Sequence, residues 1–227
     1  DDYLDCGNDS SLQFSGSFSV GCWFKTTDAT ATNEHLFSKY NGGDDAGFVL
    51  LLDSNRKINF WYAQRGGNDS PGLSYTTIVD SGSAINDGKW HHVMAVFTSG
   101  SKVELFKDGV SVGSSTSNVG NLASHVPNLF IGSQDATNKR PLACEVSSAS
   151  AYNVAKSASE VLSIYNNSIT GDESSNAGLV GYWKMDNAST VNDLSSNSNN
   201  ATVNGATLVE NVIALDSTDN NNHGDLL

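Results

Sequence analysis

The sequence predicts an all-β fold in which two antiparallel sheets form a jelly-roll sandwich, with one short helix toward the C-terminal side. Apolar and polar residues alternate over short runs, and turn residues interrupt the chain roughly every ten residues. Only one segment has the apolar spacing of a helix. The length of 227 residues suits one such sandwich with extensions.

Short strands are expected along the first two thirds of the chain. In Phe18–Lys25, every second residue is apolar, so one face of this strand is expected to be buried. The expected strands are Tyr3–Cys6, Phe18–Lys25, Glu34–Tyr40, Gly47–Asp53, Lys57–Ala63, Leu73–Val79, Trp90–Thr98, Lys102–Lys107, Val110–Ser114, Asn128–Gly132 and Cys144–Tyr152.

One hairpin is indicated by the dipeptide Asp108-Gly109, which lies between two alternating runs. Asp-Gly favours the positive φ angles of a type I′ turn, and the twist of that turn matches the twist of the paired strands. We therefore expect Val103–Lys107 to pair with Val110–Val112.

One helix is expected over Ser157–Asn166, because Ser157 and Glu160 have the spacing of a capping box. The apolar residues that follow recur at helical spacing, so this helix is expected to pack on the sandwich.

The charge balance excludes two classes of partner. The chain carries 12 basic and 25 acidic residues and a net charge of −13. Nucleic-acid and anionic-membrane binding need a basic surface, and the sequence supplies none. No apolar run approaches the length of a bilayer-spanning helix, so no membrane insertion is expected.

The three cysteines do not form a zinc-binding pattern. Cys6, Cys22 and Cys144 lie in strand-like runs, which favours their being small buried hydrophobic side chains. A Cys6–Cys22 disulfide remains an alternative.

The chain divides into three parts: a sandwich over residues 1–170, a linker over 171–178 and a strand-forming tail over 179–227. The tail contains a repeat, because Asp193–Val203 aligns without gaps with Asp216–Leu226. We expect the tail either to complete the sandwich or to open a second unit. The sequence begins at Asp1, and the second copy of the repeat is cut off by the end of the sequence. We therefore expect the chain to be a piece of a longer protein.

Several segments, in consistent order, resemble laminin-G-like domains. They are SFSVGCWFK (Ser17–Lys25), KWHHVMAVF (Lys89–Phe97), VELFKDGVSVGS (Val103–Ser114) and LFIGSQ (Leu129–Gln134). The resemblance implies a concanavalin A-like sandwich. In the tail, GLVGYWKMD resembles the usual opening of such a domain, and the segment before it resembles structural proteins of bacterial viruses that carry these domains.

Two loops are similar to the segments that bind calcium in pentraxins, Phe37–Phe48 and Ile131–Val146. The resemblance implies Asp44, Asp45, Gln134 and Asp135 as ligands, and calcium is a hard cation that prefers such oxygen donors. The pentraxin loop carries more acids and amides than this chain does, so ordinary polar turns are the alternative.

Glycan binding in this fold would use aromatic side chains beside polar groups. The candidates are Tyr40, Trp61, Tyr62 and Tyr75. Strand alternation places Trp61 and Tyr62 on opposite faces, so either one of the two is a candidate for exposure. The alternative for each of the four aromatic residues is a position in the core.

Catalysis is not expected. Glycoside hydrolases need two acidic groups at a defined separation, and the sequence contains no run that presents such a pair on one strand face.

Two functions therefore stand. The first is a structural or assembly module of a virion or extracellular fibre, whose partners are other copies of itself or neighbouring subunits, with surface glycan recognition in addition. The alternative is a carbohydrate-binding, lectin-like module of a secreted or cell-surface protein.

Overall fold

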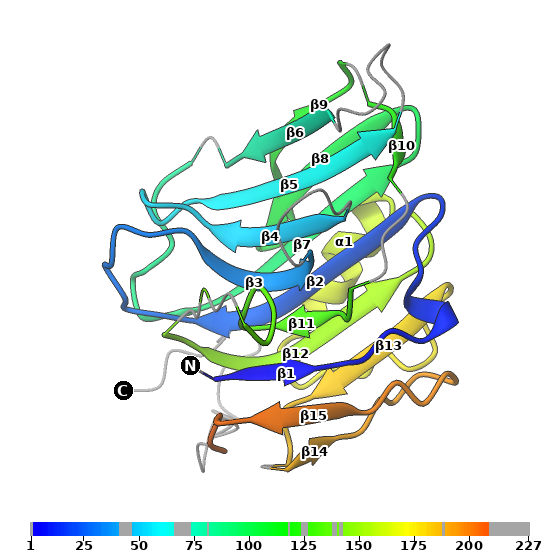
Figure 1. The fold of residues 1–227 in the computed structure, drawn as a ribbon. Helices are drawn as coiled ribbons and strands as arrows, with labels where there is room; N and C mark the ends of the chain where they lie inside the picture. The colour runs from blue at the N-terminus through cyan, green and yellow to red at the C-terminus, as the bar shows by residue number, and fades with distance from the viewer. Residues whose placement is uncertain are drawn as a thin grey trace.

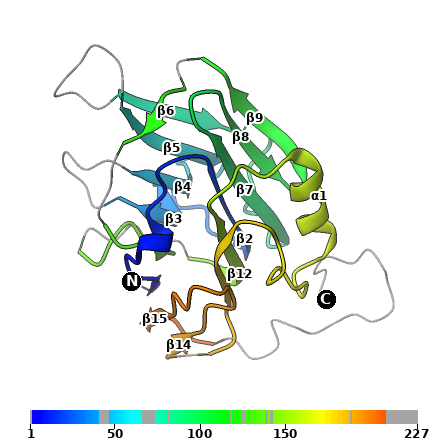
Figure 2. The ribbon, with the colours of Figure 1, turned by 90° about the vertical axis from the view of Figure 1, so that its right-hand side faces the viewer.

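The computed structural model describes residues 2–40, 47–65, 74–80, 82–117, 119–123, 127–137, 140, 143–187 and 189–208. These residues form a nine-stranded and a six-stranded antiparallel sheet, packed face to face (Figure 1). Figure 2 shows the sandwich from its edge, with the helix α1 on the outer side of the six-stranded sheet. The predicted all-β sandwich with one helix is confirmed.

The nine-stranded sheet gathers strands from both ends of the chain. Its order is β10 (Asn121–Leu122), β5 (Ile58–Arg65), β4 (Phe48–Leu52), β3 (Glu34–Lys39), β11 (Phe130–Ile131), β1 (Tyr3–Asp5), β15 (Ala201–Asn204) and β14 (Thr190–Val191), with β6 (Ser74–Val79) also paired to β5. The short strands β10 and β14 were not expected from the sequence.

The six-stranded sheet follows the expected strands closely. Its order is β13 (Leu179–Lys184), β12 (Glu145–Tyr152), β2 (Phe18–Lys25), β7 (Trp90–Thr98), β8 (Lys102–Lys107) and β9 (Val110–Ser115). A short 3₁₀ helix, η1 (Ser10–Leu12), lies between β1 and β2.

An aromatic cluster joins the two sheets. The ring of Phe18 on β2 lies 4.6 Å from that of Phe48 on β4 and 5.2 Å from that of Phe97 on β7, measured between centroids. Phe60 on β5 completes the cluster, with its ring centroid 6.2 Å from that of Phe18. All four rings are fully buried, so each contributes the full hydrophobic gain of a large side chain.

The predicted hairpin turn is confirmed. Asp108 and Gly109 have φ angles of 51° and 75°, the positive values that a type I′ turn requires at both central residues. β8 and β9 pair on either side of this turn.

The helix α1 (Ala158–Asn166) begins with the predicted capping box, in which Ser157 and Glu160 each accept a hydrogen bond from the other's backbone N–H. Val161 and Ile164 bury their side chains in a second apolar cluster with Met94, Val96, Phe106 and Tyr152. This confirms that the helix packs on the sandwich. No helix within the described ranges combines the length and apolarity needed to cross a bilayer.

Two of the three cysteines are small buried side chains, as expected, whereas Cys144 is only partly buried. Cys6 and Cys22 are free and buried, and burial raises the pKa of both thiols well above the usual value. The alternative of a Cys6–Cys22 disulfide is therefore wrong for this structure.

The tail supplies strands to both sheets of its own chain. β13 pairs with β12, with Trp183 opposite Ala149. β15 pairs with β1, with Val203 opposite Leu4. Backbone groups of β1 and β12 that would otherwise form open sheet edges are therefore hydrogen-bonded within the molecule.

A single carboxylate organises the turn that links these tail strands. Asp193 accepts hydrogen bonds from the backbone N–H groups of Tyr182, Ser195 and Asn199, each at 2.8 Å. The indole N–H of Trp183 donates to the carbonyl of Asn199 at 2.7 Å. The first copy of the sequence repeat therefore forms a hydrogen-bonded turn that fixes β13 against the segment leading to β15.

We expect Asp193→Ala to destabilise the sandwich by roughly 3 kcal/mol, because it leaves several backbone donors without a partner in a buried turn. Asp186→Ala is the matched control, since Asp186 lies in the same tail and is exposed. Chemical denaturation of the two variants measures the difference. Equal stability of both would contradict the role given to the Asp193 turn.

A second buried carboxyl group, Glu173, lies in the segment that precedes β13. Tyr152 donates its hydroxyl hydrogen bond to Glu173, and Asn176 donates to the same tyrosine oxygen at 3.2 Å. Burial raises the pKa of Glu173, because the charged form loses its hydration.

This shift makes stability depend on pH. Because the folded-state pKa of Glu173 lies above its unfolded value, its contribution is fully present below the unfolded pKa and is lost as the pH rises through the folded pKa. Glu173→Gln removes this titration, so the variant should gain stability relative to the wild type as the pH rises from about 4 to 7. Asp172→Asn should change in the opposite sense and at lower pH. The backbone N–H of Ser174 lowers the pKa of Asp172 below 3.8, so the wild type loses this contribution as the pH falls through the folded-state pKa, and the variant does not. Melting curves from about pH 2 to 7 test both signs.

Candidate functional site

Alternation along the strands determines which side chains of the nine-stranded sheet face away from the core. On β5, Ile58, Phe60 and Tyr62 belong to the core cluster. Asn59 and Trp61, which alternate with them, therefore lie on the opposite side of the sheet. We call this side the outer face.

The strand register arranges the outer face in rows. His35 pairs with Leu51, and Leu51 pairs with Asn59, which makes a row across β3, β4 and β5. We call this row the His35 row.

The neighbouring row contains the aromatic candidate Trp61, and we call it the Trp61 row. Ser38 pairs with Val49, and Val49 pairs with Trp61. Beyond Ser38 the row continues through Phe130 on β11 to Asp5 on β1. The two rows give the outer face an apolar centre with polar and aromatic side chains around it.

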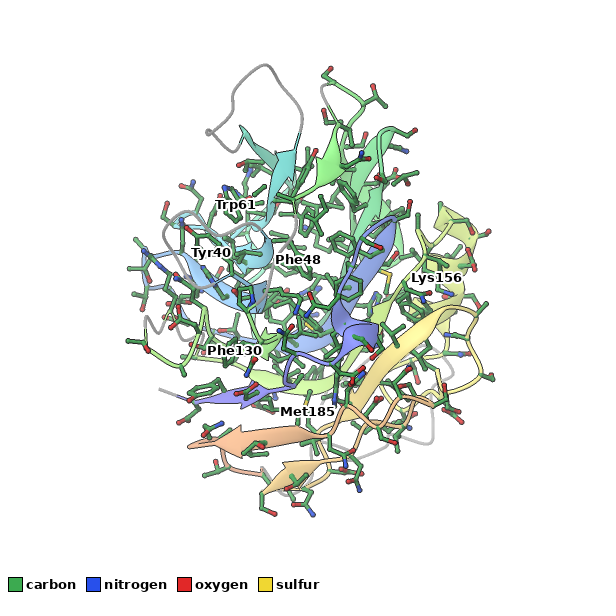
Figure 3. All side chains as sticks on the ribbon, turned by 45° about the vertical axis from the view of Figure 1, so that its right-hand side comes forward. Tyr40, Phe48, Trp61, Phe130, Lys156 and Met185 are labelled. Carbon is green, nitrogen blue, oxygen red and sulfur yellow. The ribbon has the colours of Figure 1, made fainter. Side chains whose placement is uncertain are left out.

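Tyr40 and Trp61 form an aromatic pair on this face. Their ring centroids lie 4.8 Å apart at an interplanar angle of 65°, an edge-to-face arrangement. Trp61 also packs against Ala63 and Ala123, and both aromatic side chains are half-buried. In Figure 3, Tyr40 and Trp61 lie together on the side away from Phe48, which sits between the sheets.

Two other predicted aromatic residues do not join this pair within the described side chains. Tyr62 lies wholly in the core, where its ring contacts Phe60 at 5.9 Å and Phe97 at 5.0 Å. Its inclusion among glycan-facing residues is wrong, because the alternation that exposes Trp61 buries Tyr62. Tyr75 lies on β6, and its side chain falls outside the described part of the structure.

The described residues of the loop after β11 lie beside the end of β3 that carries His35. Gln134 and Asp135 are buried in this loop, and the amide of Gln134 donates to the Asp135 carboxylate at 3.3 Å. The Nε of Arg140 donates to the side-chain oxygen Oε1 of Gln134 at 3.2 Å. The carbonyl oxygen of Arg140 in turn accepts from the backbone N–H of His35 at 3.1 Å. The loop is thus tied both to itself and to β3.

His35 is a neutral imidazole beneath this loop. Burial and, to a smaller extent, the nearby Arg140 charge lower its pKa to about 3, while Asp135 opposes the shift. Its Nδ1 has no hydrogen-bond partner within the described residues, and the same holds for the buried Oδ1 of Asn59 at the other end of the row. A buried polar atom without a partner indicates a place for a water molecule or a ligand hydroxyl group.

The calcium hypothesis can be examined in one of its two halves. Asp44 and Asp45 lie outside the described residues. In the other half, the Gln134 oxygen that would face the metal already accepts a hydrogen bond from the cationic Arg140 side chain. This half does not fit a calcium ion as it stands, and no cluster of metal-ligating side chains occurs within the described ranges. Calcium binding stays a prediction.

The calcium prediction has a direct measurement. If the two loops bind calcium, calcium chloride at millimolar concentration should raise the melting temperature relative to EDTA, since a ligand that binds only the folded state stabilises it. Asp135→Asn should abolish the increase. Identical melting in calcium and EDTA would refute the prediction, and magnesium chloride is the control for ionic strength.

Three residues in or beside the His35 row were not identified from the sequence: His35, Asn59 and Arg140. Alternation contained the signal for Asn59, because it shares the parity of Trp61 within an otherwise apolar strand. Nothing in the local sequence indicates that Arg140 returns to β3, since that contact depends on the path of the loop.

Comparisons with known proteins support the fold. The family model described as the concanavalin A-like lectin/glucanases superfamily matches residues 1–162. No curated protein matches the chain. A solved structure described as a "putative carbohydrate binding protein from Bacteroides ovatus ATCC 8483" is similar, with a TM-score of 0.68 and 16% identity over 91% of this chain and 57% of the other.

Two further structures are similar at 14% identity. The binding domain of Paraclostridial Mosquitocidal Protein 1 has a TM-score of 0.55, over 84% of this chain and 54% of the other. The CBM40 domain of the Ruminococcus gnavus IT-sialidase, bound to α2,3-sialyllactose, has a TM-score of 0.50, over 71% of this chain and 93% of the other. The chain thus spans little more than half the length of the first two structures.

Proposed function

Because the chain belongs to the concanavalin A-like lectin/glucanase superfamily, we propose that it is a non-catalytic carbohydrate-binding module. The proposed binding surface is the outer face of the nine-stranded sheet, around Tyr40 and Trp61. The coverage of 71% of the chain by a domain bound to sialyllactose, and its similarity to a structure described as carbohydrate binding, support this choice over the other functions of the fold.

The aromatic pair is the observation that carries the proposal. Trp61 is backed by Ala63 and Ala123 and held by Tyr40, so it keeps its orientation without a ligand. A rigid, half-buried aromatic side chain offers apolar area to a ligand at little cost in conformational entropy. Asn59, two residues away on the same face, has a buried oxygen without a partner in the described chain and can accept a hydroxyl hydrogen bond.

Binding without catalysis is part of the proposal. The glutamates of the described residues each have a structural partner: Glu34 pairs with Arg56, Glu104 with Lys102, Glu145 with Lys25, Glu160 caps α1, and Glu173 accepts from Tyr152. A hydrolase of this fold would instead need two acids facing one substrate bond. Incubating the protein with β-glucan, agar or alginate should release no sugars.

The assembly function that the sequence favoured is the second candidate. β15 and β13 of the same chain pair with β1 and β12, so these two edges are not open to a strand from another copy. The localisation that we propose is the surface of a virion or an extracellular fibre. Assembly with other copies or neighbouring subunits stays a prediction, and a mass measurement at micromolar concentration tests it.

We expect Trp61→Ala to abolish binding to the oligosaccharides that the wild-type protein retains on a glycan array, and Tyr40→Ala to weaken it roughly tenfold. The reason is that the first change removes the stacking surface and the second removes its support. Tyr165→Ala is the matched control, because Tyr165 is also half-buried but stacks on Trp23 on the other side of the sandwich.

Unchanged binding by Trp61→Ala, with the melting temperature preserved, would place the glycan site elsewhere. Loss of binding in Tyr165→Ala as well would show that the variants act through stability rather than through the outer face.

A further inference from the structure

We propose that the glycan carries a carboxylate group and that Arg140 binds it, so that the ligand class of the outer face is an acidic oligosaccharide. This inference rests on the proposed function and names the chemistry of the same site.

Arg140 is presented to solvent with its side chain already oriented. The residue is exposed, its Nε is held by Gln134 at 3.2 Å, and its carbonyl oxygen is held by the backbone of His35 at 3.1 Å. Since Nε is used, the two terminal nitrogens are the donors left for a ligand. Arginine forms parallel hydrogen bonds to the two oxygens of a carboxylate, and it does so more strongly when its geometry is fixed in advance.

A buried relay supports this orientation. The Asp135 carboxylate accepts from the backbone N–H of Thr137 at 2.6 Å and from the Gln134 amide at 3.3 Å. The amide of Gln134 is thereby turned so that its oxygen faces Arg140. Asp135 therefore orients Gln134, and Gln134 orients the guanidinium group.

Arg140 forms no ion pair within the described residues, whereas Arg56 is paired with Glu34 at 2.6 Å and Lys107 with Asp80 at 2.9 Å. His35 beneath it is neutral and cannot replace an anion. An oriented cation that has no ion pair in the described part of a chain of net charge −13 marks a local anion site on an otherwise repulsive surface.

The net negative charge of the protein, together with a single local cation, favours a ligand with one carboxylate over a polyanionic glycan. A heavily sulfated glycan would be repelled by the net negative charge, while a single carboxylate needs only the local field of Arg140. Arg140 is hydrogen-bonded to His35 beside β3, and Trp61 lies on β5, so three strand spacings or about 14 Å separate the two backbones across the sheet. A short oligosaccharide can therefore contact the arginine with its acidic sugar and Trp61 with a neighbouring sugar.

The full chain is tested by titration calorimetry with lactose, sialyllactose, a glucuronic-acid-terminated oligosaccharide and sulfated lactose, beside a glycan array that contains neutral sugars. We expect one of the two carboxylated ligands to bind roughly tenfold or more tightly than lactose and sulfated lactose, and which one binds identifies the acidic sugar. Arg140→Gln should remove this preference, and Arg140→Lys should keep only part of it. Lys102→Gln, on the other sheet, should leave it unchanged.

The outcomes separate the two proposals. Binding of neutral sugars with no preference for carboxylates, or a preference that survives Arg140→Gln, overturns the acidic ligand and leaves the glycan-binding function standing. Stronger binding of sulfated lactose also overturns the carboxylate. Absence of binding to every glycan on the array overturns both, and melting curves of each variant show that the folded protein was tested.

Discussion

The packing of Phe18 against Phe48 and Phe60 is the constraint on which the rest of the structure depends. These rings close the space between the sheets, and they fix the orientation of every other residue along β4 and β5. A shift of one residue in register would bring Trp61 into the core and expose Tyr62. The composition of the outer face is therefore a consequence of core packing.

The tail of the chain pairs with strands that would otherwise lie at the sheet edges. A strand buries its apolar face only if its backbone groups are paired, and β1 is too short to form a stable edge alone. β15 and β13 supply the missing pairs from a distant part of the chain, and the Asp193 turn holds them in register. This explains why a segment that resembles the opening of a domain can stand at the end of the described chain and still complete its sandwich.

On the outer face, a rigid aromatic pair and an oriented cation are held by different means. Trp61 is kept in place by neighbours on its own sheet, whereas Arg140 is kept in place by a loop hydrogen-bonded to β3. Both arrangements exist before any ligand arrives, so binding would order few side chains. The buried atoms of His35 and Asn59 that have no partner among the described residues lie in the row beside Trp61.

Local patterns in the sequence were enough for the fold class, most strands, the Asp108-Gly109 turn and the capped helix, because alternation, turn chemistry and capping act between residues close along the chain. They also placed Trp61 and Tyr62 on opposite faces of the sheet. Only the tertiary structure decided between these two, placed β13 and β15 in their sheets, and brought Arg140 to His35. Those outcomes depend on which strands become neighbours and on the paths of long loops. The physical reason is that such contacts join residues far apart in the chain, and no short-range preference encodes them.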